Sequence, residues 1–372
     1  MFQFPPLIQS LIGFLLLIGP LVVLHELGHY MVARWCGVKS DVFSIGFGKE
    51  VWGRTDKRGT RWRLAAIPLG GYVQFSGDAN ASSESDDEAI AAMSDADRSH
   101  TFAAKALWQR ALIVFAGPLA NILVALTIFA GFFMVYGKAV APSVIGGFSD
   151  NSPAKAAGLL VGDRIVAIDG RAVSEFSEIS EMVRPYPGRT LNLQIQRGTQ
   201  TIDSRVTALD HVESDKFGNT ARIGLLGVGS PRLQFERVGP IDAVVLSGQQ
   251  CWAITRMIGV GLKQIVVGER SLKELGGPIK TAKYSGEQLS MGWLNFINFI
   301  AFISINLAFI NLLPIPTLDG GHLAFYAAEA VRRRPVGARS QEWAFRAGLG
   351  FVLALMLFVT INDLASLFPW GR

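Results

Sequence analysis

Long apolar stretches with few charges dominate the pattern of hydrophobic and polar positions along the chain. The first covers about residues 5–30, and no charged residue occurs between positions 4 and 24. Three more cover about residues 103–136, 293–313 and 343–368. Each is long enough to cross a bilayer core, which takes about 20 residues of helix. The pattern therefore predicts four transmembrane helices.

Residues 42–75 differ from these stretches, because apolar and polar positions alternate and glycines and aromatic residues are frequent. This pattern predicts short strands and hairpins, with a turn at 56–59. A sheet that directly follows the first span is expected to lie on the membrane surface or to dip into it. The acidic, polar segment 78–99 is predicted to be a loop.

Residues 139–209 have the composition of a soluble α/β domain, because glycines and charges return. Strands are predicted at 164–168 and 191–195, and a helix is predicted at 175–183. Residues 240–266 show the spacing of an amphipathic helix, but several polar residues interrupt its apolar side. This predicts a helix at the membrane surface rather than a span.

The predicted fold class is a polytopic α-helical membrane protein with four transmembrane helices, a membrane-associated β-hairpin sheet and one extracytoplasmic α/β domain. The expected parts are the first two spans with the cytosol-side hairpin region, the soluble domain, an amphipathic helical segment and the last two spans. In that order they cover residues 1–138, 139–235, 236–290 and 291–372.

The composition supports a membrane location. Half of the chain is hydrophobic and only 17% is charged, with a mean hydropathy of +0.33. Ordinary soluble proteins are less apolar. The net charge of +5 is modest and does not indicate a nucleic-acid partner.

Basic residues gather at one end of each predicted span, and such residues favour the cytosolic side of a membrane. Both termini and the region 139–290 are therefore expected to face away from the cytosol. The basic residues are Arg34, Lys39, Lys105, Arg110, Arg332, Arg333, Arg334 and Arg339.

The two cysteines, Cys36 and Cys251, fall on opposite sides of the membrane in this topology, so no disulfide is expected between them. The first apolar stretch is not expected to be a signal peptide. No basic residue precedes it and no cleavage site with small residues follows it.

The first predicted span contains His25-Glu26-Leu27-Gly28-His29, a match to the pattern H-E-x-x-H. On a helix, both histidines lie on one face and can bind one metal ion, while the glutamate can deprotonate a water molecule there. A lone match also occurs by chance, and a single histidine in an apolar helix is more often structural. Ionisable side chains at membrane depth are costly without a partner, however, which favours a metal site.

A third ligand is predicted where the third span ends. Two prolines and two glycines interrupt the helix between Asn311 and His322, and irregular backbone at membrane depth occurs only where protein buries it or a cavity adjoins it. Asp319 is the one carboxylate there, and a metal ion would give it a partner. Two histidines and one aspartate leave the fourth position of zinc open, as a hydrolytic site requires. His322 is the alternative ligand, or else a residue that orients a ligand or a purely structural group.

The two histidines and Asp319 are expected at similar depths in the membrane. Arg34 follows His25 by about 14 Å of helix, and Arg332 follows Asp319 by about 20 Å. If these arginines mark the cytosolic surface, both sets lie within the cytosolic half of the membrane.

Asn121 is a polar residue in the middle of the second predicted span. It is either a contact between helices, which is the commoner role, or a group that reaches the metal site. The sequence leaves both alternatives open.

Six short stretches are spread through nearly the whole chain. They are His25-Glu26-Leu27-Gly28-His29, Gly46-Phe47-Gly48, Gly70-Gly71-Tyr72-Val73, Phe115-Ala116-Gly117-Pro118-Leu119-Ala120-Asn121, Asn311-Leu312-Leu313-Pro314-Ile315-Pro316 and Leu318-Asp319-Gly320-Gly321. In this order they resemble the site-2 protease family of intramembrane zinc metalloproteases, in particular its bacterial regulator-of-sigma-E type.

The resemblance implies a role for each part of the site. His25, His29 and Asp319 would be the zinc ligands, and Glu26 would be the catalytic base. The substrate-binding residues would be Asn311, Pro314, Gly70 and Gly71. The region 42–75 would be a membrane-associated sheet that holds an extended substrate by strand addition.

Residues from 144 to about 209 resemble a PDZ domain. The matching residues are Ser152-Pro153-Ala154, Ala157-Gly158-Leu159, Gly162-Asp163-Arg164-Ile165 and Ile168-Asp169-Gly170. This implies an extracytoplasmic domain that binds peptide C-termini. The best-known members of the family carry two such domains in tandem, and this chain has room for one.

The implied function is intramembrane hydrolysis of single-span proteins in the bacterial inner membrane. An example is an anti-sigma factor already trimmed by another protease, in regulated intramembrane proteolysis. One alternative is a membrane-anchored PDZ scaffold with a structural metal, but such a site does not need Glu26. Another is a transporter, but four spans without repeat symmetry speak against it.

Overall fold

The computed structural model describes residues 5–78, 87–214, 220–230, 234–268, 272, 276–334 and 336–367. The chain divides into two compact units. We call residues 1–131 with 243–372 the membrane unit, and residues 132–242 the soluble unit. Each is described by itself.

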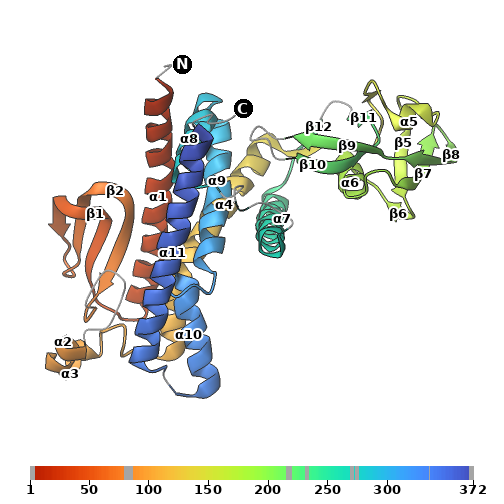
Figure 1. Ribbon diagram of the computed structural model, residues 1–372. Helices are drawn as coiled ribbons and strands as arrows, with labels where there is room; N and C mark the ends of the chain where they lie inside the picture. Colours follow the sequence, from red (N-terminus) through yellow and green to blue (C-terminus); the bar gives the residue numbers. More distant parts are fainter. Residues whose placement is uncertain are drawn as a thin grey trace. The chain divides into compact units, whose positions relative to one another are not determined.

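Four helices of the described chain are long and apolar enough to cross a membrane. They are α1 (Pro6–Trp35), α4 (Leu107–Tyr136), α9 (Trp293–Asn311) and α11 (Ala338–Leu367). This confirms the four apolar helices expected from hydropathy. The amphipathic helix α7 (Pro240–Val267) is not among them. Two shorter helices, α8 (Pro278–Ser290) and α10 (Asp319–Arg332), precede and follow α9 (Figure 1).

Small residues allow the helices of the membrane unit to approach closely. A Cβ atom added to Gly28 of α1 would lie 2.4 Å from the carbonyl oxygen of Ala116 in α4. On the other half of α1, a Cβ added to Gly13 would lie 2.7 Å from the backbone of Ser285 in α8. Glycines at such positions are typical of helix pairs in membranes, where close packing replaces the hydrophobic effect.

Helix α8 is joined to α11 by a buried carboxylate. Asp363 of α11 is fully buried and accepts hydrogen bonds from the backbone N–H groups of Gly277 and Lys280, at 3.2 and 3.0 Å. Because the first N–H groups of a helix have no partner within it, a carboxylate there stabilises the helix start. The ammonium group of Lys280 lies 3.7 Å from the same side chain.

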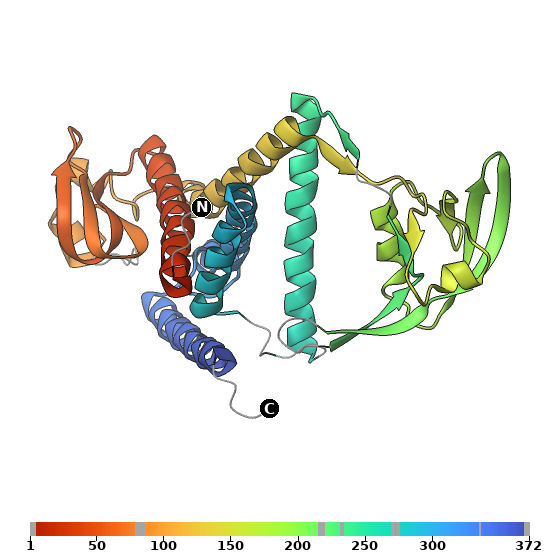
Figure 2. The same cartoon turned by 90° about the horizontal axis from the view of Figure 1, so that it is seen from above.

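One antiparallel sheet follows α1, as the alternation of residues 42–75 predicts. Strands β1 (Ser40–Thr55) and β2 (Arg61–Phe75) both bend, so that Phe43 lies opposite both Val73 and Trp62. Figures 1 and 2 show this sheet on one side of α1 and α9 on the opposite side.

Aromatic packing holds the sheet on the last turns of α1. The ring centroid of Tyr30 lies 5.6 Å from that of Phe43 and 5.2 Å from that of Trp62. The carboxylate of Asp56, in the turn between the strands, accepts from the Trp62 indole at 3.2 Å and from the Thr60 backbone at 3.0 Å. The predicted turn is therefore fixed close to the helix that carries the histidines.

The expectation of a loop at 78–99 is wrong for part of that segment. Residues 87–98 contain two short helices, α2 (Asp87–Ala92) and α3 (Asp95–Arg98). Ser94 caps α3, because its side chain accepts from the backbone N–H of Asp97. Residues 79–86 lie outside the described part of the chain.

The soluble unit is built around a four-stranded antiparallel sheet in the order β6-β5-β7-β8. These strands are β5 (Arg164–Ile168), β6 (Arg171–Ala172), β7 (Thr190–Arg197) and β8 (Gln200–Thr207). Alternate residues of β7 are buried, as the period of a half-buried strand requires. Helices α5 (Pro153–Ala156) and α6 (Phe176–Val183) complete the apolar core.

Short strand pairs complete the soluble unit. Strand β4 (Gly147–Phe148) pairs with β11 (Val228–Gly229), and β9 (Leu209–Ser214) pairs with β10 (Thr220–Leu225). Strand β3 (Lys138–Val140) pairs with β12 (Gln234–Glu236), so the segments that lead into and out of the unit form one ribbon.

Candidate metal centre

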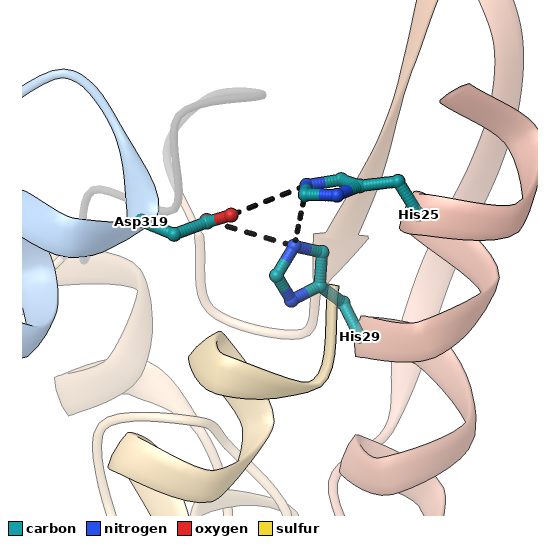
Figure 3. A group of neighbouring side chains, drawn as sticks. All are labelled: His25, His29 and Asp319. Atoms are coloured by element: carbon teal, nitrogen blue, oxygen red, sulfur yellow. Dashed lines mark hydrogen bonds and ion pairs between the residues drawn. The ribbon is translucent and has the colours of Figure 1, made fainter. Parts of the chain in front are cut away.

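Two histidines and one aspartate converge in the membrane unit. His25 and His29 lie one turn apart on α1, and their Nε2 atoms are 3.2 Å apart. The Asp319 carboxylate lies 3.2 Å from Nε2 of His25 and 3.6 Å from Nε2 of His29. Figure 3 shows both rings and the carboxylate pointing toward one another. One potential ligand atom from each residue lies within 4.8 Å of the others.

The break after α9 brings Asp319 to this position. Residues 312–318 form no regular helix, and α10 begins at Asp319. A Cβ added to Gly320 would lie 2.3 Å from the carbonyl oxygen of Leu313, and one added to Gly321 would lie 2.3 Å from that of Ile315. Only glycine allows α10 to fold back this closely on the break, which directs Asp319 toward α1.

The three side chains have the properties of a metal site. One Asp319 oxygen, Oδ2, is buried and makes no hydrogen bond to the described residues, although it lies 3.2 Å from the His25 ring. This buried oxygen needs either a proton on Nε2 of His25 or a cation bound between the two atoms. Two imidazole nitrogens and one carboxylate oxygen form a ligand set that suits zinc and leaves a fourth position open.

Helix α4 sets the orientation of both rings. The Nδ1 atom of His29 lies 2.9 Å from the carbonyl oxygen of Ile113. Because a carbonyl can only accept, Nδ1 must carry the proton, which leaves the Nε2 lone pair free. The Nδ1 atom of His25 lies 3.3 Å from the side-chain nitrogen of Asn121. Asn121 is therefore both a contact between helices and a neighbour of the candidate ligands.

Gly117 provides the space for the two rings. A Cβ atom at this position would lie 2.2 Å from Nε2 of His29 and 2.8 Å from Cε1 of His25. Gly117 lies in one of the stretches that resemble the site-2 protease family, but the sequence predicted no role for it. Its position four residues before Asn121, on the same face of the predicted helix, was the available signal.

Glu26 belongs to α1, and its side chain lies beside the end of β2. The backbone of Val73 lies beside its carboxylate, and its ionisable neighbours are His29, His25 and Asp319. A Cβ added to Gly71 would lie 3.4 Å from Cγ of Glu26. The glutamate therefore adjoins both the ligand cluster and the strand beside it.

The other predicted residues lie at varying distances from this cluster. His322 is not part of it, and its ring packs on Phe345 with the ring centroids 5.0 Å apart. Gly70 adjoins the ring of Phe47 with a positive φ of 120°. Asn311 ends α9 and Pro314 lies in the break. Among the described residues, no hydrogen bond joins either of them to the three converging side chains.

An apolar group closes the site on the side toward the start of α1. Leu17, Leu21 and Phe296 are almost completely buried there, and Leu289 of α8 packs against them. Since Leu21 lies one turn before His25, this group separates the candidate ligands from the other half of the helix bundle.

Known proteins resemble this chain along most of its length. It is 41% identical over 361 residues to a protein of Agrobacterium fabrum named "Putative zinc metalloprotease Atu1380", with 96% of each chain covered. It is 35% identical over 377 residues to Metalloprotease MmpA of Caulobacter vibrioides, with 95% of each chain covered. Among solved structures, the PDZ domain of an SdrC-like protein from Listeria innocua matches 26% of this chain and 99% of that chain. That match has 18% identity and a TM-score of 0.20.

The profile of one enzyme family covers nearly the same range. Residues 13–355 match Peptidase family M50. This range contains the HELGH stretch of α1, the facing glycine and asparagine of α4, and the aspartate of α10. The chain belongs to Peptidase family M50 and is a metalloprotease.

Proposed function

We propose that His25, His29 and Asp319 hold a zinc ion, and that Glu26 is the base of an intramembrane peptide hydrolysis. The observation that carries this proposal is the convergence of one ligand atom from each of the three residues within 4.8 Å. These residues come from helices near opposite ends of the chain. Helix α1, which carries both histidines, and α4, which faces them, are long and apolar enough to span a membrane, which supports cleavage at membrane depth.

Each side chain has a distinct part in the reaction. Bound zinc supplies a Lewis acid that polarises the scissile carbonyl and makes water more acidic. Glu26 takes the proton of the attacking water and then delivers it to the leaving nitrogen. Helix α1 carries Glu26 beside the ligands, and β2 adjoins its side chain at Gly71 and Val73. The leucines before His25 exclude water from the other side.

The edge of β2 is the proposed support for the substrate. Residues 70–75 of β2 pair with β1 on one side, and Gly71 adjoins Glu26. A transmembrane helix must unwind before its peptide bonds can be attacked, because its carbonyl groups are bonded internally. An unwound segment can add to a strand edge, where Gly70 and Gly71 allow close approach. Asn311 and Pro314 would contact it from the break after α9.

The soluble unit is the proposed site of substrate selection, as a PDZ domain on the extracytoplasmic side. A hollow lies between α6 and the short strands β4 and β11, and its apolar lining includes Phe148, Phe176, Ile179 and Val183. This lining suits the apolar end of a peptide. The proposed substrates are single-span proteins of the bacterial inner membrane, of the anti-sigma factor type, trimmed beforehand by another protease.

Replacement of Glu26 tests the chemistry. We expect Glu26→Gln to abolish cleavage of a tagged single-span protein in liposomes while it retains bound zinc, because the amide cannot accept the proton. Glu181→Gln, at an exposed position on α6, is the matched control and should cleave like the wild type. Equal cleavage by Glu26→Gln and the wild type would show that this glutamate is not the base.

Labelling of single cysteines tests the orientation. In a variant with Cys36 and Cys251 replaced by serine, we expect a cysteine at Gln200 to react with a membrane-impermeant maleimide in intact cells. Gln200 is exposed at the start of β8. A cysteine at Arg334, after α10, should react only after lysis. The opposite pattern would reverse the topology.

A further inference from the structure

We propose that Asn121 is a positioning residue for the metal site, whose side-chain oxygen accepts the Nδ1 proton of His25 and thereby frees Nε2 for the ion. This inference rests on the proposed zinc site. It concerns a residue of α4 for which the sequence leaves two roles open, a contact between helices or a part of the site.

The burial of Asn121 requires an explanation. The residue is fully buried in the middle of an apolar helix, and its side-chain oxygen has no hydrogen-bond partner among the described residues. Its side-chain nitrogen lies 3.3 Å from Nδ1 of His25. An unpaired polar atom at membrane depth is costly, and a half-turn of the amide would give the oxygen a donor while the nitrogen takes the position that the oxygen held.

The protonation of His25 decides which rotamer serves a metal site. If the amide nitrogen donates to Nδ1, the neutral ring carries its proton on Nε2, the atom that faces Asp319 and His29. A protonated Nε2 cannot bind a metal ion. A half-turn of the Asn121 amide about its Cβ–Cγ bond exchanges oxygen and nitrogen with little change in shape. The oxygen then accepts from Nδ1–H, and Nε2 carries the lone pair.

This rotation satisfies two requirements at once. It gives the buried Asn121 oxygen a donor, and it gives His25 the tautomer that His29 already has through the Ile113 carbonyl. Ligand histidines in metal sites are commonly held by such an acceptor on their second nitrogen. Both candidate ligands would then be oriented by α4, one by its backbone and one by its side chain.

A third helix contacts the backbone of Asn121. The hydroxyl group of Ser304 in α9 is fully buried and donates to the backbone carbonyl of Asn121 at 2.8 Å. This bond joins α9 to α4 through the backbone and leaves the Asn121 amide free to bond His25. Ser304 therefore offers a control that weakens the helix contact without changing the amide.

Three variants of the full-length protein separate the positioning role from a helix contact. Asn121→Leu keeps the approximate volume and removes the acceptor. Asn121→Asp keeps an acceptor and removes the donor. Ser304→Ala removes the bond between helices. The measurements are zinc affinity by competition with a chelator, the absorption spectrum of bound Co²⁺, and the midpoint of thermal unfolding in detergent.

We expect Asn121→Leu to weaken zinc binding by about 10- to 100-fold and to change the Co²⁺ spectrum. We expect Asn121→Asp to bind zinc at least as tightly as the wild type. Ser304→Ala should lower the unfolding midpoint and leave zinc affinity unchanged. Wild-type affinity in Asn121→Leu, or a tenfold loss in Asn121→Asp, would overturn the proposal.

The result for Asn121→Asp decides the question even if Asn121→Leu does not fold. His25→Ala keeps this test separate from the proposed function. If His25→Ala binds as much zinc as the wild type, the proposed metal site itself is wrong, whatever the Asn121 variants show.

Discussion

In the soluble unit most of the completely buried side chains are apolar, among them Ile165, Leu191 and Leu193 of the central sheet, and the buried carboxylate of Asp163 is paired with Arg197. In the membrane unit His25 and Asn121 are buried, whereas the aliphatic side chains of α11 are largely exposed. Apolar side chains are therefore gathered in the core of the soluble unit, whereas the membrane unit also places them on its surface. Because lipid solvates apolar groups as well as a protein interior does, the interior of the membrane unit is available for polar side chains that carry chemistry.

The polar interior of the membrane unit should be the least tolerant place to add volume. We expect Gly117→Ala to abolish stoichiometric zinc binding and to lower cleavage by at least about 100-fold, because the methyl group would displace both imidazoles. Zinc content and cleavage rate measure this effect. Gly131→Ala is the matched control on the same helix, since a Cβ there meets no atom within 4 Å. Unchanged zinc content in Gly117→Ala would contradict the close approach of α4.

Shortening an apolar side chain should cost much more stability in the core of the soluble unit than on the surface of α11. Leu191→Ala in β7 should destabilise the soluble unit by about 2–5 kcal/mol, because it leaves a cavity in a packed core. Leu357→Ala on α11 removes a side chain that is 63% exposed, and should change stability by less than about 0.5 kcal/mol. Hydrogen exchange of the full chain in detergent reports both. Equal losses of stability in the two variants would show that burial of apolar side chains does not differ between the two units in this way.

The buried carboxylate of Asp363 in the membrane unit should contribute more to stability than an exposed carboxylate in the soluble unit. We expect Asp363→Ala to destabilise the start of α8 by about 1–3 kcal/mol, because two backbone N–H groups lose their acceptor. Thermal unfolding in detergent and exchange of the α8 amides measure this loss. Asp150→Ala, at an exposed position of the soluble unit, is the control. An unchanged unfolding midpoint in Asp363→Ala would show that α8 does not depend on α11.

The smallest effect concerns acid stability of the soluble unit. Hydrogen bonds from Arg197 hold the pKa of Asp163 below its usual value. The ionised form is therefore favoured by folding, so its contribution is complete above the unfolded pKa of about 3.9. It is lost as pH falls through the lower folded pKa.

We expect this contribution to reach no more than about 1 kcal/mol, because solvent screens the Arg197 side. Unfolding midpoints of the soluble unit within the full chain, measured between pH 5 and 2, should fall more steeply for the wild type than for Asp163→Asn. Parallel curves would show that Asp163 makes no pH-dependent contribution.

The sequence was informative wherever the solvent imposes a pattern. Lipid favours long uncharged helices, and the four long apolar helices and the amphipathic α7 agree with the pattern read from the sequence. Alternation predicted the sheet at 42–75 because one of its faces packs on α1. The similar depths inferred for His25 and Asp319 also agree with their separation of 3.2 Å.

Details that depend on the rotation of one helix against another were not visible in the sequence. The approach of Gly117 to the rings and the cap that Asp363 provides for α8 require known helix pairs, and for Asn121 the sequence left two roles open. The two short helices at 87–98 were missed because a local cap at Ser94 outweighs an acidic composition. The roles of the individual site residues stay predictions until the variants above are measured.

The separation of the candidate ligands along the chain has a consequence for biosynthesis. His25 and His29 belong to α1, whereas Asp319 is translated only after most of the residues described between them. A nascent chain therefore has no complete ligand set while neighbouring membrane proteins are being inserted beside it. The order of translation would by itself delay the onset of proteolysis until Asp319 has been synthesised.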